Sequence, residues 1–344
     1  MLLEVLWNAL ANYMASWDMG VCLPDRILGP RGIIGQSHPE LEALHLTTAS
    51  HCKGSFESDI DLSKFHHLKH LSWRAPSGHD IATLSQGISQ NAAHLQSLSL
   101  EFPDARDIIR FLAARGAWTT RNIDLSLEKN PSFFARNVLQ MENCLTGSLF
   151  PSLQALTLTN VPLEAGLARY LDLSNLPNVT LRHCPGWTEF LREASTMRRA
   201  IGLKSLEVQS IIDEETGVAA EVIGALLGSF SGLEELYLYF HEDIYVNILT
   251  RWPVFQFWQH LLCHRSTLKK FMHHQRGNFS EGVSIPGDVA SFALFGRLPE
   301  RPDDDWNHHP LAALDLEALA ITSLPELLVI NPPFLNVAVI HGWL

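Results

Sequence analysis

Leucines recur along the first hundred residues of the chain in one short spacing, L-x-x-L-x-L, with small or polar residues between them. Alternation of apolar and polar positions with a period of two is typical of a strand that buries one face. Three consecutive copies begin 27 residues apart. These copies are Leu41-Leu44-Leu46, Leu68-Leu71-Trp73 and Leu95-Leu98-Leu100.

The same spacing returns less regularly along the rest of the chain. A further step of 27 residues reaches a degraded copy, Asn122-Leu125-Leu127. Later copies are Leu153-Leu156-Leu158, Leu176-Val179-Leu181, Leu203-Leu206-Val208 and Leu233-Leu236-Leu238. Weaker copies are Leu268-Phe271, Leu316-Leu319-Ile321 and Leu335-Ala338-Ile340. The pattern predicts about ten irregular repeats.

Several segments between the predicted strands have apolar residues at helical spacing. They are 79–91, 104–116, 132–144 and 214–227. A single short strand cannot bury its apolar side alone, whereas stacked strand-and-helix units share a continuous core. We therefore expect an α/β leucine-rich-repeat solenoid over residues 1–344. It would be curved, with parallel strands on the concave face and helices outside.

Two features predict departures from a regular solenoid. The asparagine that usually follows the last leucine by three places is missing in most copies. Asn130 follows the degraded copy, and Cys184 is a recognised substitute for this asparagine. The stretch 277–310 has no clear repeat and several prolines and glycines, which predicts a loop insertion.

The charge balance narrows the class of partner. The chain has 37 acidic and 25 basic residues, a net charge of -12. That balance disfavours nucleic acid, whose phosphates attract basic proteins, and it disfavours anionic membranes. Taken over the whole chain, it favours a basic partner. The apolar stretch 323–344 is interrupted by Pro332 and Pro333, so we expect a buried terminal strand rather than a membrane span.

The cysteines and the first residues bear on the compartment. The chain has five cysteines, which are widely spaced and form no C-x-x-C pair. This usage favours reduced thiols. The chain starts without the basic region of a signal peptide. We therefore expect a cytoplasmic or nuclear protein.

Four segments of the N-terminal third resemble fungal F-box and leucine-rich-repeat proteins. They are LPDRILGPRG (23–32), HPELEALHLTT (38–48), CKGSFESDIDLSKFHHLKHLSWRAPS (52–77) and NAAHLQSLSLEF (91–102). The resemblance implies that the chain recognises a substrate or partner. More specifically, it implies that the chain recognises substrates for a ubiquitin ligase. It covers the repeat region. We find no F-box before residues 3–12, which look like a repeat already under way, so a link to a ubiquitin-ligase adaptor requires an F-box upstream.

Motifs that carry chemistry are missing from the sequence. It contains no P-loop, G-x-G-x-x-G, G-x-S-x-G or H-E-x-x-H motif. His66 and His70 have a metal-ligand spacing for a helix, but they lead into a predicted strand. Cys263-His264 with His273-His274 lacks a second cysteine. We expect no catalytic residue, no metal ion and no cofactor.

The outward positions of the predicted strands are the candidates for contact with a partner. They are the residue between the last two leucines and the residue just after them. Aromatic residues and arginine are enriched in interface hot spots. We select His45, Arg74, Glu101, Arg182, Glu207, Tyr237 and Tyr239. The sequence thus predicts a protein-interaction scaffold; the alternatives are an enzyme with an unrecognised site in a solenoid pocket, or a repeat protein with no ubiquitin link.

Overall fold

The computed structural model describes nine stretches of the chain, and their contacts group into two compact units. The described residues are 14–18, 23–48, 60–103, 132–141, 148–197, 199–210, 216–242, 254–277 and 313–321. Unit 1 comprises Met1–Leu176 and Cys184–Phe190, and unit 2 comprises Pro177–His183 and Leu191–Leu344.

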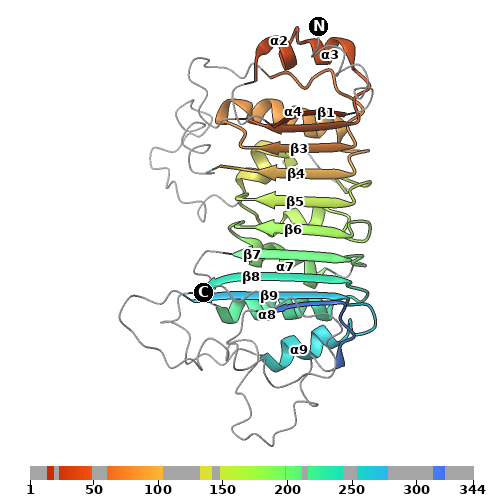
Figure 1. Ribbon diagram of the computed structural model, residues 1–344, viewed down its shortest axis with the longest axis vertical. Coiled ribbons are helices and arrows are strands. Elements are labelled where there is room, and N and C mark those ends of the chain that lie inside the picture. Colours follow the sequence, from red (N-terminus) through yellow and green to blue (C-terminus); the bar gives the residue numbers. More distant parts are fainter. Residues whose placement is uncertain are drawn as a thin grey trace, which may run out of the picture. The chain divides into compact units, whose positions relative to one another are not determined.

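Unit 1 contains five parallel strands that pair in chain order (Figure 1). They are β1 (Met14–Asp18), β2 (Ala43–Thr47), β3 (His70–Arg74), β4 (Ser97–Glu101) and β5 (Ala155–Thr159). Their register places the middle motif leucines opposite one another, and all of these leucines are buried. They are Leu44, Leu71, Leu98 and Leu156.

The helices of unit 1 lie on one side of its strands (Figure 1). They are α2 (Asp25–Leu28), α3 (Ile33–Ser37), a 3₁₀ helix (Gly78–Asp80), α4 (Ile81–Asn91), a π-helix (Phe134–Val138) and α6 (Leu167–Tyr170). A capping box starts the α4 segment, because the Asp80 carboxylate accepts both the backbone N–H and the hydroxyl of Ser77. The buried face of α4 includes Ile81, Leu84 and Ile88, the apolar positions at helical spacing.

Unit 2 repeats the arrangement with five further parallel strands. They are β6 (Asn178–Arg182), β7 (Ser205–Ser210), β8 (Glu235–Glu242), β9 (Lys270–Gly277) and β10 (Ala318–Ile321), paired in chain order. Its helices are α8 (Thr216–Gly228) and α9 (Val254–Leu262), and α7 (Trp187–Thr196) begins in unit 1 and ends in unit 2. Leu206 lies opposite Val179 and Leu236, so the buried row continues across these strands.

These elements confirm the predicted fold class, an α/β leucine-rich-repeat solenoid with irregular repeats. The helices predicted over 79–91 and 214–227 are present as α4 and α8. The helix predicted over 132–144 is shorter, a π-helix over Phe134–Val138. The helix predicted over 104–116, the strands over 122–127 and 335–340, the terminal strand over 323–344 and segment 3–12 lie outside the described residues. So does the insertion predicted over 277–310, apart from Gly277 at the end of β9.

The strand ladder differs from the predicted one at two places. β1 was not predicted, because Ala15 and Trp17 occupy the places opposite Leu44 and Leu46 and do not read as leucine positions. The regular step also ends at β4: Leu98 lies opposite Leu156, not opposite a strand 27 residues further along. The uniform spacing therefore describes three neighbouring strands.

Different side chains donate hydrogen bonds to backbone carbonyls in the turns that follow the strands. Cys184 is buried and its Sγ donates to the carbonyl of Leu158 at 3.3 Å, as expected of a substitute for asparagine. Asn160, two places after Leu158, has a positive φ of 56° and donates through Nδ2 to the carbonyl of Phe102. Thr48 donates its hydroxyl to the carbonyl of Ala75.

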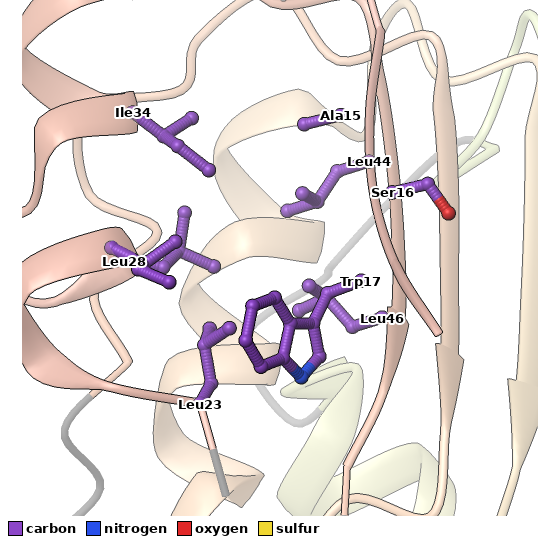
Figure 2. A pocket seen from close by; sticks show the side chains of 9 residues that line it. Ala15, Ser16, Trp17, Leu23, Leu28, Ile34, Leu44 and Leu46 are labelled. Atoms are coloured by element: carbon purple, nitrogen blue, oxygen red, sulfur yellow. The ribbon is translucent and has the colours of Figure 1, made fainter. Parts of the chain in front are cut away.

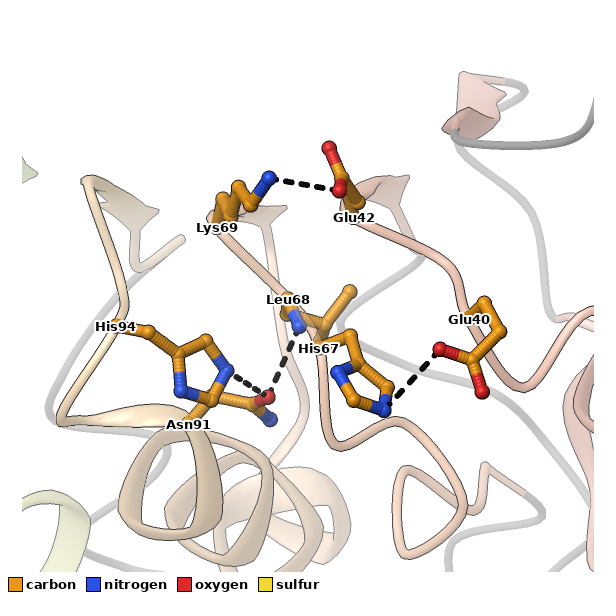
Figure 3. A network of polar contacts seen from close by, with 7 residues as sticks. All are labelled: Glu40, Glu42, His67, Leu68, Lys69, Asn91 and His94. Atoms are coloured by element: carbon orange, nitrogen blue, oxygen red, sulfur yellow. Dashed lines mark hydrogen bonds and ion pairs between the residues drawn. The ribbon is translucent and has the colours of Figure 1, made fainter.

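One buried amide fixes the turn between α4 and the strands of unit 1 (Figure 3). Asn91 is fully buried, and its Oδ1 accepts the backbone N–H of Leu68 at 2.9 Å. Its Nδ2 donates to the carbonyls of Phe65 and Gly87 at 2.7 and 2.8 Å. Buried backbone groups need such partners, because an unpaired one costs about 1–3 kcal/mol.

Unit 2 has an imidazole at the corresponding place. Asn91 lies four residues before Leu95 and accepts that leucine's N–H at its carbonyl; His264 does the same with Leu268. The His264 side chain is fully buried, and its Nδ1 accepts the backbone N–H of Leu233 at 3.1 Å. Its Nε2 is 3.0 Å from the carbonyl of Leu227, which accepts its proton.

Candidate partner-binding surface

The candidate surface is the open face of each sheet, the side away from the buried leucine row. Alternation along each strand puts every second side chain on this face. Those side chains are half-buried or exposed, whereas the residues between them are buried, as in β4 and β5. The open face therefore consists of the residues that the strands do not use for the core.

Small side chains dominate the open face of unit 1. Its central row runs across the paired strands from His45 to Ser72, Ser99 and Thr157. Burial, and then the neighbouring His70, lower the pKa of His45.

The next row of unit 1's open face carries an ion pair, in which Arg74 Nε donates to Glu101 Oε1 at 3.0 Å. Arg74 is the more exposed partner of this pair, with 62% of its side chain accessible against 39% for Glu101.

Unit 2 carries a bidentate ion pair in the corresponding region. Arg182 on β6 donates through Nε and Nη2 to the two carboxylate oxygens of Glu207 on β7, at 2.7 and 3.0 Å. The amide of Gln209 also donates to Glu207 Oε1. Two parallel bonds fix the planar guanidinium in one orientation.

A second network is centred on Glu235 of β8. Lys270 of β9 donates to Oε1 at 2.6 Å, and the hydroxyls of Tyr237 and Ser205 donate to Oε2 at 3.2 and 3.3 Å. The hydrogen bond from Lys270 is the main cause that lowers the pKa of Glu235, and the same bond raises the pKa of Lys270. Burial, and then the Glu235 charge, raise the pKa of Tyr237. Glu235, Lys270 and Tyr237 thus keep their usual charge states at neutral pH.

Apolar and aromatic groups complete this surface. Tyr237 lies opposite Glu207 and Met272 in the strand register, and Tyr239 lies opposite Gln209. Met272 is 38% exposed and adds apolar surface beside Tyr237. We call the whole set the Tyr237 face. It comprises Arg182, Ser205, Glu207, Gln209, Glu235, Tyr237, Tyr239, Lys270 and Met272.

The predicted contact residues all lie on open faces, but in two different units. Arg74 pairs with Glu101 in unit 1, where His45 also lies. The other four, Arg182, Glu207, Tyr237 and Tyr239, lie together on the Tyr237 face.

Sequence reasoning missed Ser205, Glu235 and Lys270, which stand in one row two residues before the row of Glu207, Tyr237 and Met272. Extending the period of two one step towards the strand start would have found them.

A small apolar cavity lies in unit 1 between α2, α3 and the first two strands (Figure 2). It is lined by Ala15, Ser16, Trp17, Leu23, Ile27, Leu28, Ile34, Leu44 and Leu46. The polar side chain in this lining, Ser16, points away from the cavity (Figure 2). Since the lining has no titratable group, the cavity offers no acid or base for catalysis.

The described stretches offer neither a metal site nor a membrane-spanning helix. They contain no group of three or more His, Cys, Asp or Glu side chains that could hold a metal ion. In the Cys263-His264 and His273-His274 grouping, backbone hydrogen bonds already occupy both ring nitrogens of His264. Within the same stretches, the helices are too short or too polar to cross a bilayer.

Comparisons with known proteins add little to this geometry. No family model and none of the curated proteins matches the sequence. A solved structure of a leucine-rich-repeat protein from Leptospira interrogans aligns with a TM-score of 0.39 and 15% identity, over 99% of this chain and 75% of that one. A similarity of this size decides nothing further, so the fold rests on the strand pairing and the buried leucine rows.

Proposed function

We propose that the chain is a protein-interaction scaffold that binds a protein partner on the Tyr237 face. The observation that carries this proposal is the concentration of large side chains held in place by networks on one part of a sheet. Arg182 is fixed by hydrogen bonds to Glu207 on the neighbouring strand β7, and Tyr237 donates its hydroxyl to Glu235, two residues before it on β8. Side chains that are ordered before binding lose less entropy in a complex.

The composition of the Tyr237 face also fits an interface better than plain solvated surface. Tyrosine, arginine and methionine are enriched in interfaces relative to the rest of a protein surface. Here they stand on neighbouring strands, whereas the open face of unit 1 bears Ser72, Ser99 and Thr157 at the central positions. Unit 2 is therefore the stronger candidate for the main contact.

Position-specific photo-crosslinking tests this proposal. The full-length chain would carry p-benzoylphenylalanine in place of Tyr239, and it would be irradiated in extract of the organism that encodes it. The matched control carries the same group in place of Glu221, an exposed residue of α8. Both residues lie in unit 2, so the two proteins differ in the face that presents the crosslinker.

We expect a discrete protein adduct from position 239 and none of the same mass from position 221. Equal adducts from both positions, or none from position 239, would contradict binding on this face. The pattern of adducts thus distinguishes a chain that binds a partner on the Tyr237 face from a chain that does not.

The finer version, substrate recognition for a ubiquitin ligase, rests on the resemblance of four N-terminal segments to fungal F-box proteins. Its test is co-purification of the ubiquitin-ligase adaptor with a protein that includes any upstream coding sequence. Absence of the adaptor from that purification would remove the ubiquitin link and leave the scaffold proposal standing.

We also propose that the chain is not an enzyme and that it acts in the cytoplasm or the nucleus. The apolar lining of the unit 1 cavity supports the first statement. The free thiols of Cys184 and Cys263 support the second, because oxidising compartments favour disulfides. Fractionation of the cells with an antibody against the chain tests the location, and a secreted pool would contradict it.

A further inference from the structure

We infer that the Tyr237 face recognises an acidic segment of its partner, although the chain as a whole has a net charge of -12. This inference rests on the proposed function and names the chemistry of the partner. It follows from how each ion pair on the face is turned: the acid lies against the sheet and the base lies outward.

The exposed fractions of the paired side chains carry this inference. Arg182 is 43% exposed and its partner Glu207 is 17% exposed. Lys270 is 44% exposed and its partner Glu235 is 31% exposed. A ligand that approaches the face therefore meets the cation of each pair before the anion, although the formal charges of each pair cancel.

The acids are held inward by neighbours that supply further hydrogen bonds. Gln209 donates to Glu207, and Tyr237 and Ser205 donate to Glu235. These donors partly compensate each carboxylate from within the sheet, so the bases are not its sole partners. Arg182 and Lys270 can then make a second, outer contact with a carboxylate of the partner.

In a neighbouring row of charges in unit 2, the same bias is smaller at one ion pair and reversed at the other. At the strand starts, Lys204 pairs with Glu234 at 50% and 43% exposure. Lys269 is 55% exposed and its partner Glu317 is 65% exposed. This row is balanced, which makes Lys204 and Lys269 suitable controls for a general charge effect.

The spacing of the two cations fits an extended peptide. Arg182 and Lys270 lie on strands three positions apart and are offset along the strand direction. Strand spacing and rise place their backbones roughly 20 Å apart, the span of about six extended residues. Tyr237 stands on β8, between the strands of the two cations, where its ring can contact the peptide's aliphatic atoms. Nucleic acid is the weaker alternative, because its long-range attraction needs a cationic protein.

Fluorescence anisotropy at low ionic strength tests the inference with the full-length chain. The probes are three labelled twelve-residue peptides of matched length, rich in Glu, Gln or Lys, and a single-stranded DNA of the same length. We expect the Glu peptide to bind most tightly. Arg182→Gln with Lys270→Gln should weaken its binding by about tenfold, and Lys204→Gln with Lys269→Gln by less than about twofold.

A third variant guards against loss of folding. Glu207→Gln removes the anion and keeps Arg182, so it should bind the Glu peptide as tightly as the unchanged protein, or more tightly. Thermal unfolding of every variant checks that the fold persists. Equal weakening by both double variants, or weaker binding by Glu207→Gln with its fold intact, overturns the inference.

The remaining outcomes also decide the question. Tightest binding of the Lys peptide, or no binding of any peptide, overturns the acidic partner. Tighter binding of the DNA would identify a nucleic-acid surface instead. If the crosslinker at position 239 captures a protein while these peptides fail, the proposed function stands and the acidic segment is wrong.

Discussion

The two units bury one polar side chain at the same place in their repeats, and they use different chemistry for it. In unit 1, Asn91 accepts the N–H of Leu68 (Figure 3). It also donates to the carbonyls of Phe65 and Gly87. In unit 2, His264 accepts the N–H of Leu233. The turn requires an acceptor for one leucine N–H and a donor for a carbonyl, and either an amide or a neutral imidazole supplies both.

The difference between the two groups lies in their response to pH. An amide keeps its donor and acceptor throughout the physiological range. An imidazole that gains a proton loses the acceptor at Nδ1 on which Leu233 depends. Burial lowers the pKa of His264, and its hydrogen bond to Leu227 partly opposes that shift. The buried group that holds the turn therefore titrates in unit 2, whereas in unit 1 it is an amide, to whose Oδ1 the half-buried ring of His94 adds a contact at 3.1 Å.

Removing either of the two buried polar side chains, Asn91 or His264, is expected to have the largest effect on stability. Asn91→Leu and His264→Leu each leave buried backbone groups without partners, and we expect each to lower the free energy of unfolding by about 3 kcal/mol. Urea denaturation at pH 7.5 measures the loss. Gln86→Ala and Arg265→Ala, both at exposed positions nearby, serve as controls and should change it by less than about 0.5 kcal/mol. A small effect of one of the two substitutions would mean that the two turns are not equivalent.

Replacing the imidazole of unit 2 by the amide of unit 1 tests whether the two groups are interchangeable. His264→Asn keeps a donor and an acceptor in a smaller side chain, so we expect a loss of about 1 kcal/mol at pH 7.5. The pH dependence should also become flatter. A histidine whose pKa is lowered by folding binds more protons when unfolded, so its stability contribution is complete above pH 6.5 and falls as the pH drops below that value.

The measurement is the difference between the two proteins, because burial also lowers the pKa of His45 and His183. Denaturation from pH 7.5 to pH 5.5 gives the global slope. Hydrogen exchange, corrected for intrinsic rates, should show protection lost at the Leu233 amide before the Leu68 amide as the pH falls. An unchanged slope in His264→Asn would refute the titrating role.

A smaller effect is expected from the hydroxyl relay of unit 1, which has no titrating member. Trp73 donates through Nε1 to Thr48 at 3.0 Å, and Thr48 donates onward to Ala75. Trp73→Phe should cost about 1–2 kcal/mol by removing the donor and some packing, equally at pH 5.5 and pH 7.5. If the loss of stability in this variant depended on pH, the relay of unit 1 would also be coupled to a titrating group, which would contradict this difference between the units.

The smallest effects are expected at the open-face ion pairs. Double-mutant cycles should give a coupling of about 0.3 kcal/mol for Arg74 with Glu101, which is single and exposed. The bidentate Arg182–Glu207 pair should give about 1 kcal/mol. Equal couplings would show that the second hydrogen bond adds no stability.

Much of the fold follows from local sequence, and the exceptions have clear causes. The leucine spacing predicts β2, β3 and β4 because each strand must put two apolar side chains into a shared core. It misses β1, where Ala15 and Trp17 do that work with unequal volumes. It also continues the 27-residue step past Leu98, because register between strands is a tertiary property that one strand's pattern does not contain.

The candidate surface is predicted less completely than the fold. Period-two alternation places Arg182, Glu207, Tyr237 and Tyr239 on the open face correctly. It says nothing about which charges pair across strands or which partner lies deeper, since both depend on neighbours distant in sequence. The role of His264 is hidden for the same reason: its bonding partner Leu233 is 31 residues away.

The register of β2, β3 and β4 bears on how such a chain can lengthen. Because Leu44, Leu71 and Leu98 stand opposite one another at one fixed step, residues 70–96 form an interchangeable module of one strand, one helix and the return to the next strand. A tandem duplication of the corresponding gene segment would present the same edge to β4 that β3 presents now. Growth or loss of whole modules can therefore change the length of this region in one genetic event, without a new core having to evolve.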